Sequence, residues 1–126
     1  MIDTRQCPCG SGEAYDACCG PLVRNERTAD TAEELMRSRF SAYALGDVDH
    51  VFRTWHPKTR PDDLAELPQL DWLGLEVLDV VDGGPDDDTG VVEFRARHGS
   101  GVLHERSRFV RRAGRWVYLD GGVTEE

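Results

Sequence analysis

The sequence has almost no lysine and no long apolar run. Lys58 is the one lysine among 15 basic side chains, and the surplus of arginine indicates the codon usage of a GC-rich genome more than a function. No apolar run approaches the ~18 residues that a membrane-spanning helix needs. No basic start followed by an apolar stretch marks a secretory signal at the N-terminus. We therefore expect a cytoplasmic protein.

Positive charge is in deficit along the chain. The 126 residues carry 24 acidic and 15 basic side chains, which gives a net charge of −9 with histidine neutral. Such a charge disfavours nucleic acids and anionic membranes as partners, because both repel an acidic surface. Apolar residues at 39% and charged residues at 31% are typical of a folded chain, and the length is sufficient for a core.

Helical patterns occupy residues 28–57. Thr31 followed three residues later by Glu34 forms a capping box, so we expect a helix to begin there. Apolar positions then recur at helical spacing until Gly46, which ends the helix. The pattern predicts burial along one broad face.

A second helix is expected directly afterwards. Asp47 is placed to cap it, its apolar positions continue to Trp55, and Pro57 stops it. The segment 61–64 begins with proline and predicts the start of a short third helix.

Residues 72–122 have the patterns of strands and tight turns. Alternation over 91–98, a two-residue turn at 99–100 and a strand over 102–110 predict a hairpin with a defined register. A second turn at 113–114 adds another strand. The core-facing side of this sheet is then formed by Val92, Phe94, Ala96, Leu103, Glu105, Ser107, Phe109, Tyr118 and Asp120.

Helices followed by an antiparallel meander indicate the fold class. The sequence predicts an α+β protein whose helices pack on one face of a curved antiparallel sheet. Because Glu105, Ser107 and Asp120 share the core face with aromatic residues, we expect a pocket with a polar end.

The four cysteines lie close together near the N-terminus. Cys7 and Cys9 are separated by eight residues from the adjacent pair Cys18 and Cys19, and a Gly-Ser-Gly turn lies between the pairs. Four thiolates complete one closed tetrahedral site, so we expect these residues to bind a structural Zn²⁺. The segment has few apolar residues, so metal binding would supply its folding free energy, and the remaining domain should not depend on it.

Disulfide bonding and redox chemistry fit the four cysteines less well than a metal does. A disulfide framework is unusual in a cytoplasmic chain, and a bridge between Cys18 and Cys19 would be strained. A redox pair has two residues between its cysteines, whereas here there is one or none.

These motifs resemble a known family. The segment from Cys7 to Gly20 is similar to the SEC-C motif, and the chain as a whole resembles the YchJ-like bacterial proteins, with matching motifs at 36–43, 54–60, 105–109 and 114–118. The resemblance implies an N-terminal zinc motif over 1–22 and a nuclear-transport-factor-two-like (NTF2-like), cystatin-like domain over 28–124. In that fold, helices close over a curved sheet to form a conical pocket. It implies no settled activity.

The resemblance also bears on partners. SEC-C segments of SecA are rich in lysine and bind the acidic chaperone SecB and the ribosome, whereas this loop carries Glu13 and Asp16. A protein partner through the zinc segment is therefore expected to differ from those. The outer sheet face gathers arginines and predicts a solvated surface or a homodimer contact.

Several side chains are candidates for the pocket. The predicted lining is Arg39, Tyr43, Trp55, His56, Glu105, Ser107, Phe109, Tyr118 and Asp120. We expect Glu105 to pair with Arg37 or Arg39, and we expect His56 to act as a helix C-cap. The aromatic residues are expected to serve as core, and Asp120 fits equally a turn.

Two functions remain open at this point. The first is a zinc-binding, non-catalytic protein that interacts with a partner or binds a small ligand. The alternative is a small lyase or isomerase in which Glu105, Asp120 or His56 serves as acid and base. No carboxylate lies in a motif that dictates catalysis, which favours the first.

Overall fold

The computed structural model describes residues 5–62 and 70–124. The predicted third helix at 61–64 extends outside the described residues. The cysteine segment contains a short 3₁₀ turn, η1 (Tyr15–Ala17), followed by α1 (Gly20–Val23). No helix in the described part of the chain has the length and apolar character needed to cross a membrane.

The two main helices begin where the capping residues predict. Helix α2 (Ala32–Leu45) begins after Thr31, whose side chain accepts a hydrogen bond from the Glu34 amide at 3.1 Å. Helix α3 (Val48–Arg53) begins after Asp47, which accepts from the His50 amide at 3.1 Å. Each cap satisfies an amide that has no partner within its helix.

Helix α3 is shorter than the sequence predicts. It ends at Arg53, and Trp55 forms an isolated bridge with Tyr118 of the sheet instead of extending the helix. The Tyr118 amide donates to the Thr54 carbonyl at 2.7 Å, and the His56 amide donates to the Tyr118 carbonyl at 2.8 Å. Pairing with the sheet edge replaces the last helical turn.

The helices and the sheet form the predicted α+β fold. Its strands are β1 (Trp72–Asp82), β2 (Thr89–His98), β3 (Gly101–Arg112) and β4 (Arg115–Thr124), all antiparallel and adjacent in chain order. The turn at 99–100 gives the predicted register, with Phe94 opposite Glu105.

The register prediction fails at one point in β4. Phe109 pairs with Tyr118 as predicted, but a bulge follows, so that Asp120 lies opposite Arg108 and Gly121 opposite Ser107. One extra residue on the bulged strand transfers everything beyond it to the other face. Asp120 therefore lies on the outer face of the sheet, and its predicted place on the core face is wrong.

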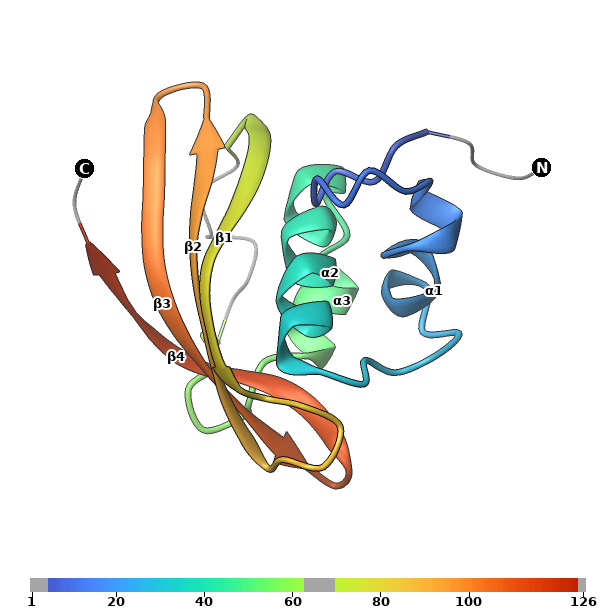
Figure 1. The fold of residues 1–126 in the computed structure, drawn as a ribbon, viewed down its shortest axis with the longest axis vertical. Helices are drawn as coiled ribbons and strands as arrows, with labels where there is room; N and C mark the ends of the chain where they lie inside the picture. The colour runs from blue at the N-terminus through green and yellow to red at the C-terminus, as the bar shows by residue number, and fades with distance from the viewer. Residues whose placement is uncertain (1–4, 63–69, 125–126) are drawn as a thin grey trace.

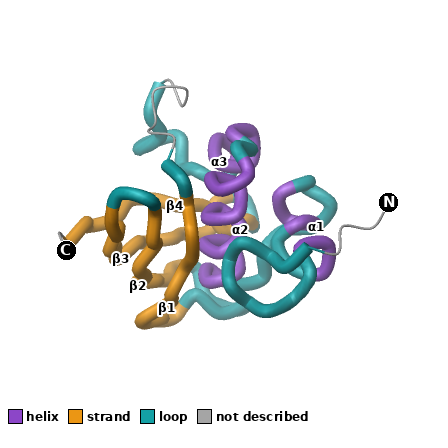
Figure 2. The backbone as a smooth tube through the Cα atoms, turned by 90° about the horizontal axis from the view of Figure 1, so that it is seen from above, coloured by secondary structure: helices purple, strands orange, loops and turns teal. Residues whose placement is uncertain are grey.

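Helix α2 lies in the middle of the molecule. Figure 1 shows α2 and α3 covering one face of the sheet, with α1 and the cysteine segment on the side of α2 away from the sheet, and Figure 2 shows the same order from above. Cys7 and Cys9 belong to the same buried cluster as Phe40, Ala42 and Val51. The helix is therefore buried on two sides instead of one, and the cysteine segment forms part of the core, contrary to the prediction that the two are separate.

A candidate metal centre and a candidate ligand pocket

The four cysteine sulfurs converge on one point. All four Sγ atoms lie within 4.8 Å of one another, with 3.6 Å between Cys9 and Cys18 and 4.0 Å between Cys18 and Cys19. All four are free thiols. Metal–sulfur bonds of about 2.3 Å in a tetrahedral site place the sulfurs about 3.8 Å apart, so the arrangement fits one metal ion.

A small loop brings the two cysteine pairs together. The Cys7 amide donates to the Glu13 carbonyl at 2.8 Å, and the Tyr15 amide donates to the Arg5 carbonyl at 2.7 Å. Between these bonds the chain reverses through Gly10 and Gly12, whose φ angles of 81° and 85° lie in the left-handed region that glycine adopts without strain. The loop thus holds Cys7 and Cys9 facing the second pair.

The electrostatics of the cluster favour a bound cation. Cys9 has no exposed surface, and hydrogen bonds from the Cys19 and Cys7 thiols lower its pKa. Burial raises the pKa of Cys18 to about 11, and hydrogen bonding to Cys7 and Cys9 raises the pKa of Cys19. Without a cation, the thiolate form is favoured at Cys9 and disfavoured at Cys18 and Cys19. A divalent metal removes this conflict, because it stabilises every thiolate.

Helix α2 holds the cluster from the inner side. The Cys7 sulfur lies 3.5 Å from the Ser41 hydroxyl, and Arg37 donates to the Cys9 carbonyl at 2.9 Å. Glu33 orients the Arg37 guanidinium through a 3.0 Å ion pair. These contacts join the cysteine cluster to the domain that follows it.

A second feature is a cavity of about 330 Å³ between α2 and the inner face of the sheet. Aromatic and aliphatic side chains form most of its wall. The predicted pocket residues that line it are Arg39, Tyr43, Trp55, Glu105, Ser107, Phe109 and Tyr118. Met36, Phe40, Leu70, Trp72, Phe94, Ala96 and Leu103 complete the lining.

Glu105 is the one carboxylate among the described lining residues. Its Oε2 accepts hydrogen bonds from the Ser107 hydroxyl and, at 3.2 Å, from the Tyr118 hydroxyl. A Cβ atom added at Gly121 would lie 2.5 Å from the same oxygen. The glycine therefore leaves the space in which the Glu105 carboxylate lies.

Arg39 lies beside Glu105 without forming an ion pair with it. The guanidinium donates to the Val51 carbonyl at 3.0 Å and to the Thr54 hydroxyl at 2.8 Å. It lies over the rings of Trp55 and Tyr118, with centroid distances of 5.0 and 4.7 Å. Burial lowers its pKa. The prediction that Glu105 pairs with an arginine of the first helix is therefore wrong, because hydroxyl groups take that place.

Two predicted lining residues lie elsewhere. His56 follows the early end of α3 in a turn, where its Nδ1 accepts from the Lys58 amide at 3.0 Å, so it neither lines the cavity nor caps the helix. Asp120 forms an ion pair with Arg108 on the outer face, because the β4 bulge turns it away.

His50 is a buried histidine, 3% exposed, that no motif in the sequence indicates. Arg53 lies 3.2 Å from its Nδ1, and the Ser38 hydroxyl lies 2.9 Å from its Nε2. Because Arg53 can only donate, Nδ1 accepts and Nε2 carries the proton, which it donates to Ser38. Ser38 in turn donates to the Leu35 carbonyl at 2.7 Å. No sequence pattern on a six-residue helix indicates a buried histidine.

We expect His50 to make stability fall in mild acid. Burial lowers its pKa from 6.5 to about 4. As the pH falls below 6.5, His50 is protonated in the unfolded chain but stays neutral in the folded chain, so the free energy of unfolding decreases. The decrease ends near pH 4, where the folded chain is protonated as well. The integrated cost is about 3 kcal/mol. Urea unfolding at several pH values should show a shallower pH dependence for His50→Gln, whereas parallel curves would contradict this role.

The outer sheet face is a network of ion pairs. Arg106 contacts Asp79 at 3.0 Å and Glu93 at 2.8 Å, and Glu93 also binds His104 at 2.7 Å. Arg108 pairs with Asp120. Arg106 and Arg108 are therefore balanced by neighbouring carboxylates.

Comparison with known proteins matches the two parts of the chain separately. Residues 6–21 match the SEC-C motif, and residues 31–121 match the middle NTF2-like domain of YchJ. A UPF0225 protein of Streptomyces coelicolor is 52% identical over 120 residues, which cover 95% of this chain and 97% of that protein. A UPF0225 protein of Ralstonia nicotianae is 47% identical and covers 96% and 93%.

Solved structures are also similar. The solution structure of a SEC-C motif containing protein from Rhodopseudomonas palustris is 40% identical, with a TM-score of 0.80 over 94% of this chain and 98% of that one. The crystal structure of a SEC-C motif containing protein from Psychrobacter arcticus is 28% identical, with a TM-score of 0.74 over 100% and 87%.

Proposed function

The chain belongs to the UPF0225 family, with a SEC-C motif and a YchJ-like, NTF2-like domain, and from this premise we propose that it is a zinc protein that binds a small ligand. The ligand site is the cavity between α2 and the sheet. That aromatic cavity, with a single carboxylate among the described residues of its wall, is the observation that carries the proposal.

The proposed metal is Zn²⁺ in a structural role. Four thiolates are the donor set that zinc takes in closed structural sites, and the sulfur spacing fits its tetrahedral geometry. Four protein ligands leave no position for substrate or water, so the metal supplies stability rather than chemistry. Four reduced cysteines also support a cytoplasmic location.

The cavity supports a small and largely apolar ligand. Its volume of about 330 Å³ falls within the range of small-molecule sites, ~300–1,000 Å³. Arg39 and Glu105 bring opposite charges to the wall, so the site favours a neutral ligand. The Glu105 carboxylate has acceptor sites left beyond those used by Ser107 and Tyr118, and the ligand is therefore expected to carry a hydroxyl group on an apolar body.

We expect 2-naphthol to bind in this cavity. Glu105→Gln should weaken that binding about tenfold, because the variant loses a hydrogen bond to a charged acceptor. Naphthalene has no donor, so its affinity should not change. Two-dimensional NMR titration of the zinc-loaded protein gives both the affinity and the location of the bound probe.

Glu93→Gln on the outer sheet face is the matched control, because it removes the same charge outside the cavity. Its affinity for 2-naphthol should equal that of the unmodified protein. Equal losses in both variants, or shifts confined to other surfaces, would contradict a ligand site at Glu105.

The acid–base enzyme remains a second candidate because of one contact. The Tyr118 phenol donates to Glu105 at 3.2 Å within an apolar cavity, a pairing of proton donor and acceptor that acid–base chemistry can use. In that case Glu105→Gln would keep ligand affinity within a small factor and abolish conversion of the bound ligand.

Self-association through the outer sheet face stays a prediction, which sedimentation of the zinc-loaded protein would test.

A further inference from the structure

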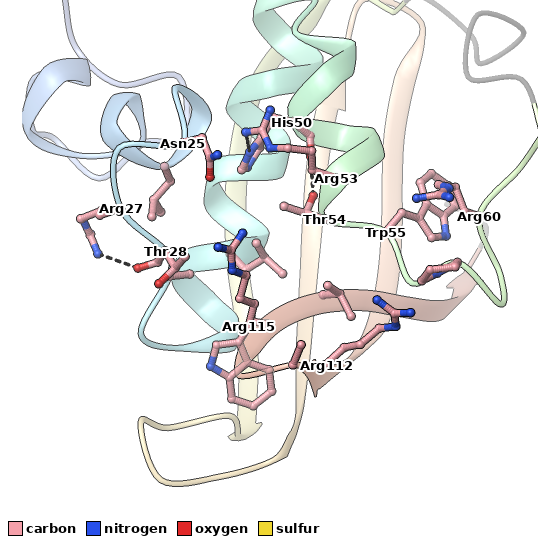
Figure 3. A pocket seen from close by; sticks show the side chains of 17 residues that line it. Asn25, Arg27, Thr28, His50, Arg53, Thr54, Trp55, Arg60, Arg112 and Arg115 are labelled. Carbon is pink, nitrogen blue, oxygen red and sulfur yellow. Dashed lines mark hydrogen bonds between the residues drawn. The ribbon is translucent and has the colours of Figure 1, made fainter.

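A second cavity of about 460 Å³ lies at the other end of the helices. It is bounded by the segment after α1, by α3 and the turn that follows it, and by the hairpin between β3 and β4 (Figure 3). Leu22, Leu35 and Trp116 are buried in its wall. The two cavities have Trp55 in common, so that side chain stands between them.

The rim of this cavity is strongly basic. Five arginines line it, and no aspartate or glutamate does among the described residues. The arginines are Arg27, Arg53, Arg60, Arg112 and Arg115. A chain with 24 acidic and 15 basic side chains thus gathers a third of its basic residues around one cavity.

Three of these guanidinium groups have no carboxylate partner among residues 5–62 and 70–124. Arg27 pairs with Glu34 at 2.8 Å, and Arg53 pairs with Asp49. Arg60 donates to the Phe52 carbonyl and lies over that ring, 3.7 Å from its centroid. Arg112 and Arg115 form no ion pair within the described part of the chain.

Two arginines of the outer sheet face differ from these in having carboxylate partners. There Arg106 and Arg108 each pair with a carboxylate, as exposed arginines of an acidic protein readily do. At the cavity, Figure 3 shows Arg115 reaching from the hairpin toward the level of Thr28 and Thr54, and Arg112 extending toward Trp55 and Arg60. These guanidinium groups point across a concave, partly apolar surface instead of along a neighbouring strand.

We propose that this cavity binds a small organic anion. Its phosphate or carboxylate group is held at the arginine rim, where Arg112 and Arg115 have no carboxylate partner among the described residues, because a guanidinium donates two parallel hydrogen bonds to such groups. Its apolar part packs on Trp116 and Val117, which form the buried wall. A free small molecule fits better than a polyanion or an anionic lipid surface, because the site is concave and the net charge of −9 repels extended negative charge.

Phenyl phosphate is the probe, titrated into the zinc-loaded protein and followed by two-dimensional NMR. We expect saturable shifts at the Trp116 indole and the Val117 amide. Inorganic phosphate should bind more weakly because it lacks the ring, and phenol should not compete because it lacks the anion. Vesicles containing phosphatidylglycerol should not bind the protein.

Two double variants make the test specific. Arg112→Gln with Arg115→Gln should weaken phenyl phosphate binding by about tenfold or more. Arg106→Gln with Arg108→Gln changes the net charge equally on the outer sheet face and should leave the affinity nearly unchanged. All four positions are exposed, so neither variant threatens the fold.

Several results would overturn the proposal. Equal losses in the two double variants would assign the binding to net charge, and phenol binding as tightly as phenyl phosphate would assign it to the apolar wall alone. Absence of saturable shifts at millimolar probe, or binding to vesicles in place of the soluble anion, would also exclude the site. The 2-naphthol titration concerns the other cavity, so its outcome is independent.

Discussion

Replacing Cys9 by serine should release the bound metal and destabilise the whole chain. Cys9 has no exposed surface, and the cluster to which it belongs includes Phe40 and Val51 of the helices. Structural zinc sites of four protein ligands are worth ~10–16 kcal/mol in small peptides, while a whole domain is stable by roughly 5–15 kcal/mol. Loss of the metal is therefore expected to destabilise the whole chain by several kcal/mol, beyond any effect on the cysteine segment alone.

Two measurements test this expectation. Metal analysis of protein purified under reducing conditions should find about one zinc per chain in the unmodified protein and none in Cys9→Ser. Denaturant unfolding should show that the variant loses several kcal/mol. Ser11→Ala is the matched control, because Ser11 is an exposed neighbour in the same loop whose hydroxyl donates to the Cys18 sulfur. A metal-free Cys9→Ser protein with unchanged unfolding would contradict the shared core.

Arg39→Met should cost about 3 kcal/mol, although methionine fills much of the same space. Arg39 is 6% exposed, and its removal leaves the Val51 carbonyl without that donor. The cation also lies over two aromatic rings, Trp55 and Tyr118, in a desolvated site where such contacts are strongest. Glu105 would in addition lose the positive charge beside it.

The control for this variant is Arg106→Met. Arg106 is an exposed arginine in ion pairs on the outer sheet face, and such pairs contribute about 0–1 kcal/mol. Denaturant midpoints of the two variants, measured at one pH, give the comparison directly. Similar small losses in both would show that the buried guanidinium contributes no more than a surface one.

The elements that could be predicted were those with local signals. The Thr31 cap, the Asp47 cap and the turn at 99–100 each act within a few residues, so their positions follow from the sequence. The bulge in β4 and the early end of α3 do not, because both depend on Tyr118 meeting Trp55 and its neighbours across the fold. Those two features removed Asp120 and His56 from the predicted pocket.

The candidate sites divide in the same way. The cysteine cluster is close in sequence, and its spacing was sufficient to identify it. The arginine-lined cavity draws on three distant segments, near residues 27, 53–60 and 112–115, and no one of them has an unusual pattern. Burial of α2 on two sides was also missed, because Ser38 and Ser41 are polar and interrupt the apolar pattern.

The central place of α2 has a consequence for how the chain emerges during synthesis. One side of α2 faces the cysteine segment, which precedes it in the chain, and the other side faces the sheet, which follows it (Figure 1). The cysteine segment therefore leaves the ribosome first and can contact α2 before any strand exists. Each strand then pairs with the one made just before it, whereas the segment after α3 can pair with Tyr118 only once β4 has been made. Metal binding to the cysteine cluster is therefore expected to begin during translation, before the sheet is complete.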